Sequence, residues 1–139
     1  MPLIFTWLIF CFSFPAFAAP KSVTIGFVVD GNTGVTSQNV DRFTTVLKQN
    51  NNDELYSLAF SKKYTFSAEH SIESVAEALD LAMRNREIDM IIMTGPIGAK
   101  VASDLGRKKG LNKPVIAPIV FDAGLQGIGV DINSNRSNI

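Results

Sequence analysis

Three stretches of the chain are apolar on both faces and end in turn-forming residues: 23–29, 88–94 and 114–121. They are rich in β-branched residues and lack a helical period, which is typical of strands buried on both sides of a parallel sheet. A fourth stretch, residues 62–67, alternates in character and predicts a short strand at an edge of the sheet.

The segments between these strands favour helices, because their apolar residues recur at spacings of three and four. We expect the first helix to start at a cap on Thr36 or Ser37 and to continue through an asparagine-rich patch to Phe60. The second, residues 72–86, follows a natural cap at Ser71, and the third, residues 97–109, ends at Gly110. The apolar stripe of the second helix consists of Ile72, Val75, Ala76, Leu79, Ala82 and Met83.

This alternation of strands and helices predicts an α/β fold, an open parallel sheet with helices on both faces. A chain of 139 residues has room for one such domain. In open parallel sheets, ligands bind outside the carboxyl ends of the strands, near the point where the strand order reverses. We therefore expect a binding site in the loops 30–36, 94–99 and 121–126.

The first eighteen residues contain no charged side chain and end in Ala16-Phe17-Ala18. An apolar segment of this length before a small-x-small site predicts a signal peptide, residues 1–18, cleaved after Ala18. An uncleaved membrane anchor is the alternative, but Pro15 interrupts the apolar run, which is shorter than the ~20 residues that span a bilayer. Cleavage would remove Cys11 and leave residues 19–130 as an α/β lobe without cysteine, followed by a polar, flexible tail, residues 131–139.

The charge balance excludes one class of partner. Thirteen Lys and Arg residues balance thirteen Asp and Glu residues, so the formal charge is zero. A protein that binds nucleic acid or anionic lipid usually carries a basic surface. We therefore expect no nucleic-acid partner, and contact with a membrane only through another protein.

The segment TGPIGAK, residues 94–100, joins a predicted strand to a predicted helix. It lacks the Gly-Lys-Ser/Thr of a phosphate-binding loop and the Gly-x-Gly pair of a dinucleotide fingerprint, so we expect no nucleotide and no other cofactor. The free amides at the helix start would attract a carboxylate, which makes Thr94, Gly95, Pro96, Ile97 and Gly98 candidate ligand-binding residues. The alternative is that the two glycines only make a tight turn.

Asp30 and Asp122 end two predicted strands at the same edge, and Gly31 follows Asp30. A carboxylate there can hold an amine or hydroxyl group of a ligand; equally, each aspartate can bond the amides of its own turn. His70 is the only histidine, and a surface or capping role is favoured over catalysis. We expect no metal site and no enzymatic activity, since no metal-spaced cluster is present and only Thr94 offers a hydroxyl at a strand end.

The exported start, the strand VTIGFVVDG (residues 23–31) and the segment from Ile88 to Gly129 resemble the amino-terminal lobe of type 1 periplasmic binding proteins. Substrate-binding proteins of ABC transporters are the most similar kind, and the likeness is carried mainly by residues 88–95 and 118–125. The resemblance implies a periplasmic, non-enzymatic protein that binds a small molecule such as an amino acid and delivers it to an ABC permease or another inner-membrane partner.

Such proteins hold their ligand between two lobes, whereas this chain ends after one. The resemblance therefore implies either a truncated fragment, which we favour, a one-lobed domain that works with another chain, or a relative reused as a scaffold. A ligand-sensing or assembly domain that acts with a membrane partner is the alternative function.

Overall fold

The structure is a computed structural model that describes residues 19–51, 55–120 and 122–128. Three parts of the sequence prediction lie outside these residues: the signal peptide (residues 1–18, up to its cleavage site), Phe121 and the tail (residues 131–139). So do the side chains of Thr36 and Ser37, the two predicted helix caps.

Within the described residues, four parallel strands form one sheet in the order β2-β1-β3-β4. β1 (Lys21–Val29) lies in the middle and pairs with β2 (Tyr56–Ser67) on one side and β3 (Met90–Thr94) on the other. β4 (Val115–Ile116) pairs with β3 and forms the second edge. The fold is therefore α/β with an all-parallel sheet, as the sequence predicts, and β2 has the predicted edge position.

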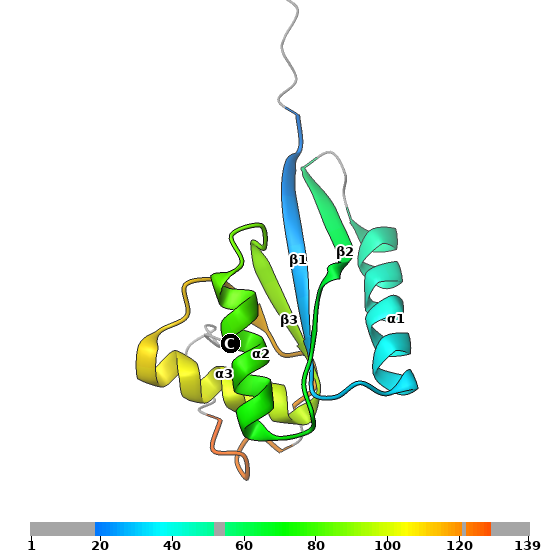
Figure 1. Ribbon diagram of the computed structural model, residues 1–139. Helices are drawn as coiled ribbons and strands as arrows, with labels where there is room; N and C mark the ends of the chain where they lie inside the picture. Colours follow the sequence, from blue (N-terminus) through cyan, green and yellow to red (C-terminus); the bar gives the residue numbers. More distant parts are fainter. Residues whose placement is uncertain (1–18, 52–54, 121, 129–139) are drawn as a thin grey trace, which may run out of the picture.

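Three helices in the described part of the chain cover both faces of this sheet (Figure 1). α1 (Gly34–Asn50) packs on the face that carries Ile25, Phe27 and Ile92. α2 (Ile72–Arg84) and α3 (Pro96–Lys109) pack together on the opposite face, over Val28, Ile91 and Met93. Consecutive residues of β1 and β3 alternate between the two cores, which explains why both strands are apolar throughout.

The second helix forms as predicted, and its start has a local cause. Ser71 accepts a hydrogen bond from the Ser74 amide at 3.1 Å, and the Ser74 hydroxyl accepts one from the Ser71 amide at 3.3 Å. This reciprocal pair satisfies amides that the helix itself leaves without acceptors. Val75 and Leu79 are fully buried, whereas Ile72, predicted to face the core, is 58% exposed.

Two predicted boundaries are wrong. The first helix ends at Asn50, and residues 56–60, which were expected to belong to it, form the start of β2. Leu55, Leu58 and Ala59 fit a helical spacing, but Tyr56, Leu58 and Phe60 fit a strand equally well, and pairing with β1 decides between them. The predicted strand 114–121 shrinks to Val115–Ile116, since the flanking prolines have no N–H to donate to a ladder.

Candidate functional site

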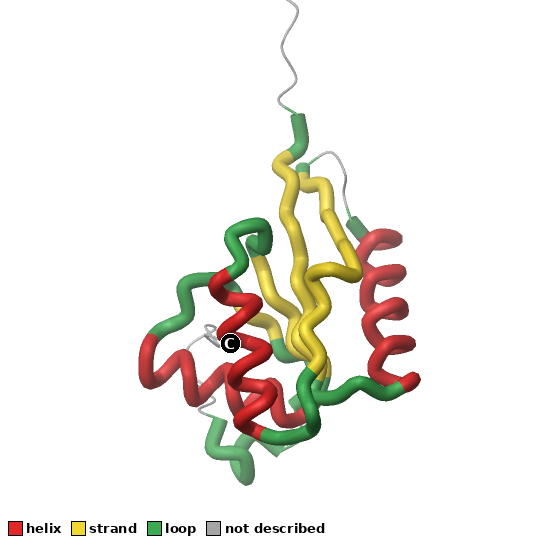
Figure 2. Tube along the Cα trace, in the orientation of Figure 1, coloured by secondary structure: helices red, strands yellow, loops and turns green. Residues whose placement is uncertain are grey.

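The carboxyl ends of β1 and β3 lie side by side, with Val29 paired to Thr94. From there the chain leaves β1 toward α1 on one face and leaves β3 toward α3 on the other. This divergence is the reversal of strand order at which open α/β sheets bind ligands. Figure 2 shows the loops that follow the strands gathered at this lower end of the molecule.

Asp30, the first residue after β1, has its carboxylate at the start of α3. Its Oδ2 accepts a hydrogen bond from the Ile97 amide at 2.7 Å, and its Oδ1 accepts one from the Gly98 amide at 3.1 Å. The Asp30 residue is only 5% exposed. An aspartate 67 residues earlier in the chain thus caps α3, a role usually taken by the residue directly before a helix.

Two predicted site glycines make this approach possible. A Cβ on Gly95 would lie 2.2 Å from the Asp30 carboxyl carbon, and one on Gly98 would lie 3.0 Å from the Met93 Cβ. Gly95 occupies the cap position of α3 without a capping side chain, and Pro96 takes the first helical position. The predicted anion-binding amides therefore hold an acidic group, and that group belongs to Asp30.

Burial raises the pKa of the Asp30 carboxyl above its ordinary value, although the hydrogen bonds from Ile97 and Gly98 and the nearby His70 pull that pKa down. The hydrogen bonds and the nearby His70 therefore offset only part of the cost of removing the Asp30 carboxylate from water. A buried ionisable group of this kind, at the ligand edge of an α/β sheet, is a candidate functional residue.

His70 joins the same corner from the loop after β2. Its amide donates to the Asp30 carbonyl at 2.7 Å, and its backbone φ is +55°. A Cβ on Gly31 would lie 2.0 Å from two atoms of the His70 ring, so the imidazole lies directly over the Gly31 backbone. The loop after residues 62–67 was not among the three expected to form the site, although it also follows a parallel strand and opens on the same edge.

Thr94 is the last residue of β3 and is 3% exposed. Its hydroxyl is buried and has no hydrogen-bond partner among the residues that the structure describes. Thr94 pairs with Val29, so its side chain faces the α1 side of the sheet, away from the bonds between Asp30 and α3.

Asp122 is not brought to this corner. It is exposed, and its Oδ1 accepts a hydrogen bond from the Leu125 amide at 3.0 Å, within its own turn. Its φ of +44° fits that turn. Asp122 therefore bonds an amide of its own turn, which is one of the two roles expected for these aspartates. Asp30 instead bonds the amides of another element, α3.

A cavity of about 270 Å³ opens beside Gly31, on the α1 face of the sheet. The ends of β1 and β2 contribute Val29, Thr65 and Ser67, and α1 contributes Val40 and Asp41. Lys62 and Asn32 complete the lining. The cavity thus adjoins the predicted loop 30–36 and has a mixed polar and apolar wall.

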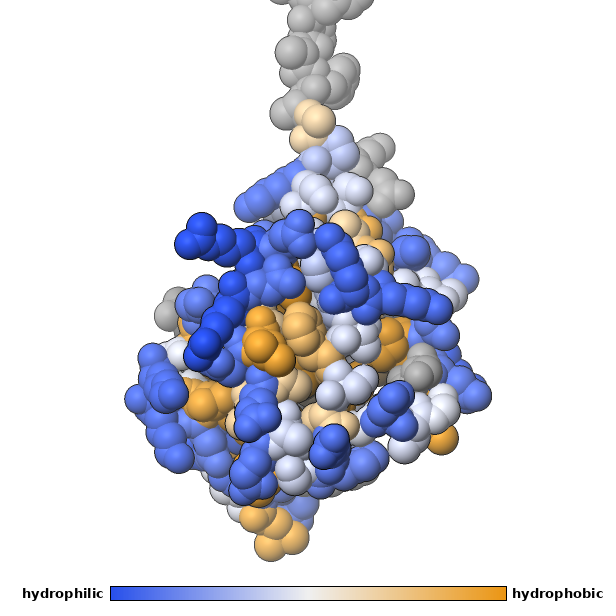
Figure 3. Space-filling view, in the orientation of Figure 1, coloured by the Kyte–Doolittle hydropathy of each residue, from blue (hydrophilic) through white to orange (hydrophobic). Residues whose placement is uncertain are grey.

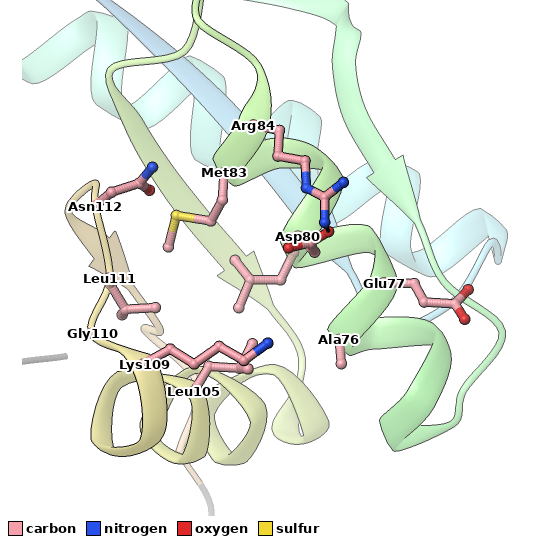
Figure 4. A pocket seen from close by; sticks show the side chains of 11 residues that line it. Ala76, Glu77, Asp80, Met83, Arg84, Leu105, Lys109, Gly110, Leu111 and Asn112 are labelled. Atoms are coloured by element: carbon pink, nitrogen blue, oxygen red, sulfur yellow. Dashed lines mark ion pairs between the residues drawn. The ribbon is translucent and has the colours of Figure 1, made fainter.

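A second cavity, about 520 Å³, is a groove between α2 and the end of α3 (Figure 4). Met83, Leu105 and Leu111 point toward one another across it, and an ion pair of 2.7 Å between Arg84 and Asp80 lies on its rim. Figure 3 shows apolar side chains on this side of the molecule enclosed by hydrophilic ones. The groove belongs to the helix layer, and no predicted site residue lines it.

Among residues 19–51, 55–120 and 122–128, no three His, Cys, Asp or Glu side chains gather in a way that could hold a metal ion. Within the same residues, no helix combines the length and apolar character needed to cross a bilayer. Comparison of the chain with protein families, with curated proteins and with solved structures finds no match.

Proposed function

We propose that this chain is a solute-binding lobe that takes up a small molecule, such as an amino acid, at the carboxyl edge of its sheet. The observation that carries the proposal is Asp30, a buried carboxylate with a raised pKa at the point where the strand order reverses. Burial of an ionisable group costs free energy, and such groups are common at sites that bind or transform ligands.

The proposed activity is binding without chemistry. Thr94 offers a hydroxyl at the end of β3, but its burial to 3% exposure keeps it away from a substrate in the edge loops. His70 lies over Gly31, where it can line a ligand.

The proposal includes export to the periplasm and delivery of the solute to an ABC permease. Support for this part comes from the apolar segment 1–18 and from the resemblance to type 1 periplasmic binding proteins. The resemblance also implies a second wall that faces this site, because such proteins hold their ligand between two lobes.

A thermal-shift screen of the full chain with amino acids and small carboxylic acids tests the binding function. A ligand that binds only the folded state stabilises it by about 2.7 kcal/mol at a hundred times its Kd, which raises the melting temperature measurably. The absence of any shift across the screen would contradict the proposal.

A pull-down from periplasmic extract tests the partner. A transport receptor should recover a permease. Recovery of a kinase or chemoreceptor would instead favour the alternative of a ligand-sensing domain.

A further inference from the structure

The cavity beside Gly31 is built around an irregularity of β2. Between the pairs Ile25–Phe60 and Phe27–Thr65, residues 61–64 of β2 stand opposite Gly26 alone. Such bulges change the direction of side chains and are common next to functional sites. Here the bulge contains two adjacent lysines, Lys62 and Lys63, whose side chains have different surroundings.

Lys63 lies 3.1 Å from the Glu87 carboxylate, while the neighbouring Tyr64 packs into the core under α2 and α3. Lys62 instead lines the cavity on the α1 face. The bulge therefore directs a positive charge to the cavity and leaves the next lysine bound elsewhere.

Asp41 lines the same cavity from α1, so a negative charge faces it as well. The two charged groups form no ion pair with each other, although both line one cavity. Opposite charges that face a shared space without meeting can each bind a complementary charge of a ligand.

The floor between these charges suits the same kind of ligand. Thr65 pairs with Phe27 and Ser67 with Val29, so both hydroxyl side chains point to the α1 face and line the cavity. A hydroxyl can donate to a carboxylate or accept from an ammonium group. Val29 and Val40 add apolar wall, and about 270 Å³ accommodates only a small molecule.

We propose that this cavity binds a small zwitterion, an α-amino acid, with its carboxylate at Lys62 and its ammonium group at Asp41. The inference rests on the proposed function and gives it a place and a ligand class. The acidic group of the ligand is placed at a side chain on β2 and not at the α3 amides, because Asp30 occupies those amides.

Amide NMR of the labelled full chain tests the inference, with the common L-amino acids as probes. The best binder is then compared with its amide, which lacks the carboxylate, and with its N-acetyl form, which lacks the ammonium group. We expect the free amino acid to shift the signals of Gly31, Thr65 and Ser67, and each derivative to bind at least about tenfold more weakly, because a charge-assisted bond is lost.

Lys62→Met and Asp41→Asn should each weaken binding by a similar factor. Lys63→Met is the matched control, since it removes the adjacent lysine that binds Glu87, and it should leave the affinity unchanged. Retained affinity in both cavity variants, or equal binding of the derivatives, would overturn this inference while solute binding itself survives. A ligand found in the thermal-shift screen that is not a zwitterion would also overturn it, and the absence of any ligand would refute both proposals.

Discussion

Gly95→Ala tests the contact between Asp30 and the start of α3. The new methyl group would lie 2.2 Å from the Asp30 carboxyl, and Asp30 is too buried to move aside. Loss of a helix cap costs about 1–2 kcal/mol. The Gly95 backbone, at φ 159° and ψ 161°, adds about 1–3 kcal/mol for a residue other than glycine.

We therefore expect Gly95→Ala to lower the free energy of unfolding by about 2–5 kcal/mol. Urea unfolding followed by circular dichroism measures this loss; tryptophan fluorescence is unsuitable because the single tryptophan, Trp7, lies in the predicted signal peptide. Typical domains have about 5–15 kcal/mol of stability, so the variant should remain folded in water.

Gly106→Ala is the matched control, the same chemical change inside α3. A Cβ there would lie at an ordinary 3.6 Å from Leu111, and alanine favours a helix over glycine, so this variant should gain about 0.5–1 kcal/mol. In an Asp30→Ala background the cap is already lost, so the cost of Gly95→Ala should fall by about 1–2 kcal/mol. A cost that is the same in both backgrounds, or a gain for Gly95→Ala, would refute the proposed contact.

Three further changes have expected outcomes. Because burial raises the pKa of Asp30, the contribution of this carboxyl group to stability is full below its ordinary pKa and is lost as pH rises through the raised pKa. In urea titrations, the free energy of unfolding of Asp30→Asn should therefore improve relative to that of the wild type as pH rises. A difference that stays constant with pH would contradict this. Ser71→Ala should cost about 1 kcal/mol and speed hydrogen exchange in the first turn of α2; unchanged exchange would count against the cap. Leu79→Ala, fully buried, should cost about 2–5 kcal/mol by the same urea titrations, whereas Leu81→Ala, 59% exposed, should stay within about 0.5; equal costs would contradict the assigned core.

The sequence predicted the fold well wherever local pattern and tertiary packing agree. β1 and β3 are apolar on both faces because helices cover both, and α2 carries its own cap. The pattern failed at residues 56–60, where helical and strand spacings both fit and only pairing with β1 decides. It also failed to show the bulge of β2, because residues 61–64 leave the ladder for reasons that no local period encodes.

The candidate site was predictable as a place but not as a set of contacts. Knowing that parallel strands end at one edge is enough to bring Asp30 near Gly95. It cannot show that the carboxylate turns toward the Ile97 and Gly98 amides, since that depends on how closely β1 and α3 approach. For Asp122 a local rule sufficed, because the bonded amide lies three residues away.

Occupation of the α3 amides by Asp30 changes which ligand chemistry the edge can support. The partial positive charge of the helix start is already matched by a full negative charge, so a second carboxylate arriving there would meet Asp30 as well as the amides. Among the residues that line the neighbouring cavity, Lys62 carries the positive charge. An acidic group of a ligand would therefore be attracted to Lys62 on β2. The carboxylate of Asp41 on the opposite wall would attract an ammonium group of the same ligand.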